Sequence, residues 1–312
     1  MLATYIIPAH IPPVCILGVK DKWVDMIRKD TTARIGVKNT DITVFTQDET
    51  EARRIIHVFE TLEAYADLYE NITSEDVKRI LRQSHEGGIF TPADKDVLLK
   101  WGKQTVRAQT PKQTEYANMI EHNPITFATG PAGCAKTFIA TVTALKLLMK
   151  TKQVKQIVIT RAPVALDGME LGFTPGTAEE KQAQWLGPVL DVLRRFLSPD
   201  KIKELLESQK IRMIPLAYLR GYSFEDSMVI VDEAQNLRIQ TFKSVCTRLG
   251  ENSRLVFCGD SAQCDLKQSG FETAATILSK VDGVGVMRFD TSDIVRSGIT
   301  RDVIEAFTQY GY

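Results

Sequence analysis

Short apolar runs alternate with amphipathic segments through the second half of the chain. The runs are bounded by turn residues, and the segments between them repeat apolar positions every three or four residues. Buried strands that alternate with helices are typical of a doubly wound, mostly parallel α/β sheet. We predict strands at 125–129, 157–160, 211–214, 228–231, 255–258 and 284–289, and helices at 137–150, 179–197, 201–208, 237–249 and 271–280.

The first part of the chain has a different pattern. It predicts a short strand from residue 14, a helix, a second strand near 41–45, and then two helices. The last of these helices begins at a capping box of Thr73 and Asp76. From residue 84 the chain becomes polar and carries glycines and prolines, which favours a linker. The expected organisation is a small α+β domain at 1–83, a linker at 84–110 and an α/β domain at 111–312.

Composition narrows the class of protein. The 312 residues carry 39 basic and 39 acidic side chains, so the formal net charge is zero. This balance argues against nucleic-acid binding by bulk positive charge, although it leaves room for a local basic groove. The longest apolar runs are too short for a membrane span. Five cysteines, odd in number and without CxxC spacing, favour reduced thiols and a cytoplasmic location.

The first strand of the α/β domain runs into a glycine-rich turn. Backbone N–H groups converge on phosphates in such a turn when a helix follows it. Lys136 is expected to reach the β- and γ-phosphates of a nucleotide, and the Thr137 hydroxyl to bind Mg²⁺. Ala135 replaces the second glycine of GxxxxGK[ST], at a cost on the order of 1 kcal/mol if φ there is positive. The predicted phosphate-binding residues are Gly130, Pro131, Ala132, Gly133, Cys134, Ala135, Lys136 and Thr137; the alternative is an ordinary strand-to-helix turn.

Two later strands also end in polar residues. Asp232 follows one of them and is expected to hold Mg²⁺, while Glu233 orients and deprotonates the attacking water. The alternative is that the two acids merely begin a helix. After the next strand, Gly259 and Asp260 precede Gln263, which is placed to detect the γ-phosphate by one hydrogen bond.

Further candidates lie outside these turns. Gln113 precedes the glycine-rich turn, and its amide offers the donor and the acceptor that an adenine edge requires. Three arginines close to strand ends are candidates for the cation that stabilises the transition state: Arg161, Arg220 and, as first choice, Arg296. Each of the three could equally be a surface or salt-bridged arginine.

Together these motifs resemble the PhoH-like family of P-loop ATPases. The resemblance implies a RecA-like core with helicase-superfamily character, binding ATP and Mg²⁺, and an N-terminal domain that is weakly KH-like. The chain departs from the family pattern at Ala135, in the order Arg161-Ala162-Pro163, and in lacking a GxxG loop. The carrying segments are GPAGCAKT at 130–137, ELGFTPG at 170–176, PLAYLRG at 215–221, VIVDEAQN at 229–236, LVFCGDSAQCDL at 255–266 and SDIVRSG at 292–298.

These observations lead to a functional hypothesis. It is a Mg²⁺-dependent ATPase that remodels or unwinds RNA or another single-stranded nucleic acid. The alternative is an ATP-switched regulator or scaffold that does not translocate. Residues 111–312 have room for one sheet lobe of roughly 150–200 residues. An arginine at the γ-phosphate is therefore expected to come from a neighbouring subunit, in a homo-oligomer that the resemblance suggests is a ring of six.

Overall fold

The computed structural model describes residues 2–68, 72–85, 96–102, 104–162, 187, 189–264 and 269–295. Two compact units divide the chain, Met1–Val97 and Leu98–Tyr312. Each unit has its own hydrophobic core.

The first unit is a small α+β module. Its three strands form an antiparallel sheet in the order β1-β3-β2, and Ile42 and Val44 of the central strand are fully buried among the helices. The capping box is confirmed, because Thr73 and Asp76 exchange backbone-to-side-chain hydrogen bonds of 2.9 and 3.2 Å. The elements are β1 (Leu2–Ile6), α1 (Pro13–Leu17), α2 (Lys22–Lys29), β2 (Arg34–Lys38), β3 (Asp41–Phe45), α3 (Glu49–Leu68) and α4 (Ser74–His85).

One prediction for this unit is wrong. The expected strand from residue 14 is instead the helix α1, which has Pro13 in its first turn and ends at Gly18 with φ 78°. A short apolar run does not distinguish a strand from a buried turn of helix by periodicity alone. A proline at the first helical position was the available signal, because its fixed φ suits a helix start.

The stretch expected to be a linker contains regular structure. Strands β4 (Val97–Trp101) and β5 (Gln104–Arg107) form a two-stranded sheet inside residues 84–110. Leu98 and Leu99 are buried in the core of the second unit. This part of the chain therefore belongs to the folded α/β unit.

The second unit contains a six-stranded, all-parallel sheet in the order β11-β6-β10-β9-β7-β8. All six predicted strands are present, and the RecA-like P-loop fold is confirmed. The elements are α5 (Pro111–His122), β6 (Ile125–Thr129), α6 (Lys136–Leu145), β7 (Gln156–Arg161), α8 (Pro199–Glu207), β8 (Ile211–Met213), β9 (Ser227–Asp232), α9 (Ile239–Cys246), β10 (Arg254–Gly259), α10 (Phe271–Leu278) and β11 (Val284–Arg288), with short 3-10 turns η4 (Leu216–Gly221), η5 (Ala234–Asn236), η6 (Ser261–Gln263) and η7 (Thr291–Asp293).

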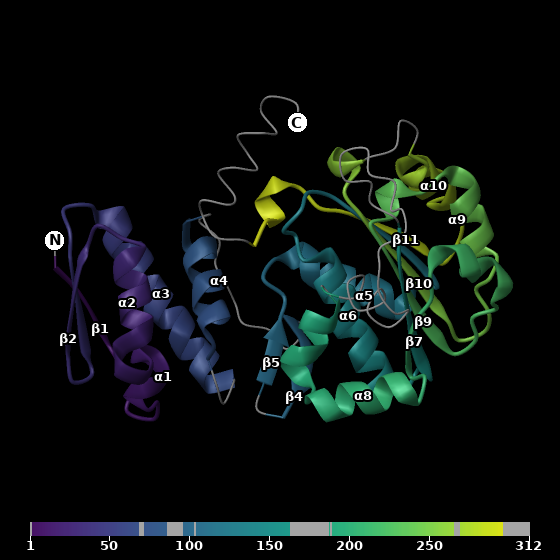
Figure 1. Ribbon diagram of the computed structural model, residues 1–312. Helices are drawn as coiled ribbons and strands as arrows, with labels where there is room; N and C mark the ends of the chain where they lie inside the picture. Colours follow the sequence, from purple (N-terminus) through teal and green to yellow (C-terminus); the bar gives the residue numbers. More distant parts are fainter. Residues whose placement is uncertain are drawn as a thin grey trace, which may run out of the picture. The chain divides into compact units, whose positions relative to one another are not determined.

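Helices cover both faces of this sheet (Figure 1). One core cluster joins the sheet to α5, α6 and α8, and a second joins it to α9 and α10. Phe127 of β6 stacks on Phe257 of the neighbouring strand β10, with ring centroids 4.8 Å apart, in the second cluster. Within the described part of the chain, no helix has both the length and the apolarity that crossing a membrane requires.

Candidate nucleotide-binding site

The order of the strands determines which loops meet. β6, β10, β9 and β7 are consecutive neighbours in a parallel sheet, so their carboxyl ends lie along one edge. The glycine-rich turn follows β6, Asp260 follows β10, Glu233 follows β9, and Arg161 is the last residue of β7. Ligands of open α/β sheets bind at this edge. Residues from four distant parts of the sequence are thereby collected into one site.

The glycine-rich turn contains three left-handed residues. Gly130 has φ 141° and Gly133 has φ 95°, and a Cβ on Gly130 would lie 2.6 Å from the carbonyl oxygen of Phe289. Ala135 also adopts the left-handed conformation, with φ 64° and ψ 26°, immediately before α6. The position that the motif usually gives to glycine thus requires a positive φ here. Alanine pays roughly 1–2 kcal/mol for it.

Lys136 lies over this turn. Its Nζ donates to the carbonyl oxygens of Gly130 at 2.6 Å and Pro131 at 2.8 Å. The ammonium group is therefore held at the loop by its own backbone. This is where a point charge for phosphates is needed.

Thr137 and Asp232 meet across the site. The Thr137 hydroxyl donates to Asp232 Oδ1 at 2.7 Å, which joins the first turn of α6 to the end of β9. Asp232 is buried, with 8% of its surface exposed. Burial raises the pKa of its carboxyl, and the hydrogen bond from Thr137 works against that rise.

These two groups fit magnesium. Mg²⁺ selects hard oxygen ligands at about 2.0–2.1 Å in an octahedron, so neighbouring ligand oxygens lie about 3 Å apart. The hydroxyl oxygen of Thr137 and the carboxylate oxygen of Asp232 are already close to that separation. Bulk water does not reach the buried carboxylate of Asp232 to stabilise its negative charge, and a bound cation would stabilise that charge instead.

Glu233 is held between two donors. Arg161 Nη2 donates to one carboxylate oxygen at 2.8 Å, and Gln235 Nε2 donates to the other at 2.8 Å. Arg161 Nε also lies 3.8 Å from Asp232 Oδ2, so one guanidinium pairs with both acids. The backbone of Glu233 is left-handed, with φ 53° and ψ 37°, a conformation that residues other than glycine seldom adopt.

Gln235 connects the acidic pair to the next loop, and sequence reasoning missed it. Its Nε2 also lies 3.2 Å from the carbonyl oxygen of Gln263, and its Oε1 accepts from the backbone N–H of Asp260 at 3.0 Å. It is 1% exposed. Gln235 lies inside the VIVDEAQN segment, but the groups that its amide joins lie partly in a later loop, which no local pattern indicates.

Gln113 lies behind the phosphate loop. Its Nε2 donates to the carbonyl oxygen of Cys134 at 3.3 Å, and its Oε1 accepts from the backbone N–H of Gln109 at 2.7 Å. Only 2% of Gln113 is exposed. Its amide thus supports the phosphate loop from behind. Gln263, by contrast, is exposed on η6, beside the end of β10.

The three candidate arginines have different outcomes. Arg161 lies in the site. Arg220 belongs to η4, but its side chain, like the whole of Arg296 and the ELGFTPG segment, lies outside the described residues. The residue before Arg296 is described: the Val295 N–H donates to the carbonyl oxygen of Gly133 at 3.1 Å. The segment after β11 therefore runs along the phosphate loop.

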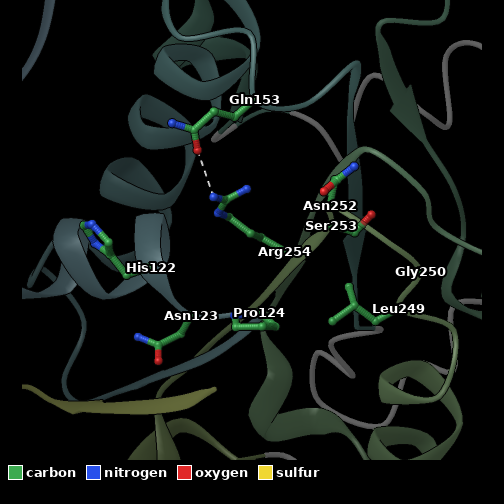
Figure 2. Close-up of a pocket in the computed structure, with 9 residues that line it drawn as sticks. All are labelled: His122, Asn123, Pro124, Gln153, Leu249, Gly250, Asn252, Ser253 and Arg254. Carbon is green, nitrogen blue, oxygen red and sulfur yellow. Dashed lines mark hydrogen bonds between the residues drawn. The ribbon is translucent and has the colours of Figure 1, made fainter. Parts of the chain in front are cut away.

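A separate hollow of about 420 Å³ lies at the opposite edge of the same sheet (Figure 2). Pro124 and Arg254 in its lining stand at the amino ends of β6 and β10. Arg254 donates to Gln153 Oε1 at 2.8 Å and to the carbonyl oxygen of Glu121 at 2.9 Å. The length of the sheet separates it from the glycine-rich turn.

Comparison with known proteins shows similarity to one protein family over most of the chain. The family model described as PhoH-like protein matches residues 105–308. A PhoH-like protein of Synechocystis is 32% identical over 98% of this chain and 94% of its own length, and one of Bacillus subtilis is 32% identical over 94% and 92%. The Sulfolobus solfataricus SWI2/SNF2 ATPase core in complex with dsDNA is 15% identical over 65% of this chain and 47% of that chain, at a TM-score of 0.37.

Proposed function

Because the chain belongs to the PhoH-like family, we propose that it is a Mg²⁺-dependent ATPase that acts on RNA or single-stranded nucleic acid. A P-loop ATPase in the general sense follows from the family and the fold. The magnesium dependence, the hydrolytic roles of individual residues and the nucleic-acid substrate are the proposal.

The hydrogen bond between Thr137 and Asp232 carries the proposal. It brings the hydroxyl of the phosphate loop and the carboxylate at the end of β9 to within 2.7 Å. An ordinary strand-to-helix turn has no need of a buried carboxylate at its helix start. A site for a metal-bound nucleotide needs this pair, because the metal must contact both the loop and the phosphates.

The proposed roles follow from position. Lys136 binds the β- and γ-phosphates, Thr137 and Asp232 hold Mg²⁺, and Glu233 orients and deprotonates the attacking water. Gln263 detects the γ-phosphate, and Gln235 holds its loop against Glu233. Magnesium, when bound, neutralises charge on the phosphates. An arginine then stabilises the remaining charge of the transition state.

A Glu233→Gln variant tests the hydrolytic role. We expect turnover to fall by at least 10²-fold, because general-base catalysis contributes 10²–10⁴-fold, while ATP still binds. The matched control is Glu204→Gln, which changes an exposed carboxylate paired with Lys201 on α8. Unchanged turnover in Glu233→Gln would remove Glu233 from the mechanism, and no ATP binding by the unaltered protein would reject the function.

Exposed aromatic residues support the nucleic-acid part of the proposal. Tyr218 is 66% exposed on η4, and Tyr222, just after it, is 36% exposed. The guanidinium of Arg212 lies 5.0 Å above the Tyr222 ring. Aromatic faces beside arginine are typical of surfaces on which the bases of single strands stack, at about 1–3 kcal/mol per base.

Two variants of these tyrosines separate the proposal from its alternative. Tyr218→Ala with Tyr222→Ala should weaken binding of single-stranded RNA and reduce its stimulation of ATP hydrolysis. The matching phenylalanine variants keep the rings and should retain both. An ATPase rate that is indifferent to RNA and single-stranded DNA would instead favour an ATP-switched regulator or scaffold without translocation.

The proposed assembly is a homo-oligomeric ring of six subunits, in which Arg296 or Arg220 reaches the site of a neighbour. An arginine at the γ-phosphate contributes 10³–10⁵-fold in rate. Mixing inactive Lys136→Ala subunits with inactive Arg296→Ala subunits should therefore restore activity. No recovery in the mixture would argue against an arginine acting between subunits, and the Arg220→Ala mixture provides the comparison.

A further inference from the structure

Arg161 is the only described cation that pairs with either acidic residue at the end of β9. β7 and β9 are neighbours with Arg161 directly opposite Asp232 in the register, and the Ala162 N–H donates to the carbonyl oxygen of Asp232 at 2.9 Å. The guanidinium is therefore fixed beside the acids by strand pairing. It does not depend on a loop conformation.

The pairing is incomplete. Arg161 Nη2 makes a hydrogen bond of 2.8 Å with Glu233, but the buried Nε finds no hydrogen-bond acceptor in the described residues, since Asp232 Oδ2 is 3.8 Å away. A buried donor without an acceptor destabilises the arrangement. The other oxygen of Asp232, Oδ1, accepts a hydrogen bond from the Thr137 hydroxyl. Arg161 thus places a positive charge beside Asp232 and Glu233, but it makes a hydrogen bond only with Glu233.

We propose that Arg161 is an internal counter-ion for Asp232 and Glu233. Its guanidinium competes with the divalent cation that accompanies the nucleotide, and it holds Glu233 until that cation binds. The inference rests on the proposed ATP site, and it assigns Arg161 a positioning role. The guanidinium and the cation are both positive, and both are drawn to the Asp232 carboxylate. Their mutual repulsion means that binding of one weakens the contact of the other.

Release of Glu233 follows from the same competition. One of its oxygens is engaged by Arg161 and the other by Gln235. With a donor on each carboxylate oxygen, Glu233 must loosen the contact with Arg161 to take up the attacking water. Phosphate oxygens are the natural new partners for the fork of an arginine. The arrival of the nucleotide with its cation thus removes Arg161 from the acids and offers it another anion.

The Mg²⁺ dependence of ADP binding tests this inference without hydrolysis. The concentration of Mg²⁺ that gives half-maximal binding of a fluorescent ADP analogue should fall at least three-fold in Arg161→Gln, because a competing cation is removed. Arg161→Lys keeps the charge and loses the fork, so it should stay close to the unaltered protein. Lys155→Gln is the matched control, because Lys155 pairs with Asp226 at 2.7 Å just before the other end of β7.

The outcomes are separable. If the unaltered protein binds ADP in a Mg²⁺-dependent way and Arg161→Gln needs as much Mg²⁺ or more, the inference is wrong and the proposed function stands. If the unaltered protein binds no ADP at any Mg²⁺ concentration, both are rejected.

Thermal unfolding gives a second readout. Without nucleotide, Arg161→Gln should unfold at a lower temperature than Arg161→Lys, because Asp232 and Glu233 lose their counter-ion. Mg²⁺ with ADP should remove most of that difference by supplying the charge. A deficit that persists unchanged with Mg²⁺ and ADP would mark Arg161 as a purely structural residue and overturn the inference.

Discussion

The Thr137 hydroxyl donates a hydrogen bond of 2.7 Å to Asp232, ninety-five residues further along the chain. In the proposed site, the affinity for Mg²⁺ depends on this hydroxyl. Thr137→Val keeps the shape of the side chain but removes the oxygen, so ADP affinity in the presence of Mg²⁺ should fall at least tenfold, about 1.4 kcal/mol.

Thr137→Ser is the control for that change, because it retains the hydroxyl and should retain Mg²⁺-dependent binding. Titrations with and without Mg²⁺ check the prediction. An equal loss in both conditions would show that Thr137 acts on the phosphates and not through the metal.

Asp232 should reduce the stability of the nucleotide-free protein at neutral pH. Burial raises the pKa of its carboxyl above the value in the unfolded chain. The ionised carboxylate therefore lowers the stability of the folded protein at neutral pH, and this loss disappears at low pH, where the group is protonated in both states. Asp232→Asn should therefore raise the melting temperature at pH 7.5. The advantage should shrink as the pH falls toward about 4, the pKa of an unfolded aspartate.

The control variant should change the melting temperature at neutral pH in the opposite direction. A hydrogen bond from Lys155 lowers the pKa of Asp226, so its contribution to stability is present at neutral pH and lost in acid. Asp226→Asn should lower the melting temperature at pH 7.5 and have less effect near pH 3. Melting curves across this pH range compare the two. A neutral-pH loss in Asp232→Asn would contradict the prediction.

Ala135→Gly should stabilise the protein. The residue has φ 64°, a conformation that costs alanine roughly 1–2 kcal/mol and glycine almost nothing. The greater flexibility of glycine in the unfolded chain removes part of that gain. A net gain of about 0.5–1 kcal/mol corresponds to a rise of about 1–4 °C in melting temperature. Ala132, which has no positive φ, should give no gain when changed to glycine.

Gln113→Ala distinguishes two roles for Gln113. Loss of its amide leaves the Cys134 carbonyl and the Gln109 N–H without this partner, so the melting temperature and the nucleotide affinity should fall together. A residue that recognises adenine would instead alter the preference for ATP over GTP and leave stability unchanged. Gln240→Ala on the exposed side of α9 is the control.

The sequence was sufficient for the parallel sheet and its phosphate loop. A strand buried on both faces, such as Met228–Val231, is a continuous run of apolar residues, and such runs are typical of parallel sheets. The strand order was not accessible in the same way, because it depends on how segments far apart in the chain pair. Three arginines therefore stood as candidates, with Arg296 as first choice. Only the pairing of β7 with β9 brings Arg161 to the acidic residues.

Residues that act through backbone contacts were also beyond the pattern. Gln235 acquires its partners from a turn that begins 25 residues later. The hairpin of β4 and β5 was missed because its two strands are short and are flanked by glycines and prolines. The contacts of Gln235 with the later loop are tertiary, so no local repeat of apolar residues reveals them.

The parallel alignment of β6, β10, β9 and β7 also determines where the chain tolerates changes of length. The groups that meet at this edge stand at strand ends, in the turns that follow them or in the first turn of α6, and a strand advances about 3.3 Å per residue. One residue inserted within β9 or β10 would shift the register and turn each following side chain to the opposite face. Insertions at the amino ends of the strands, on the edge that carries the hollow of Figure 2, leave the carboxyl ends in place. Variation in length between relatives is therefore expected at that edge, and constancy of strand length at the other.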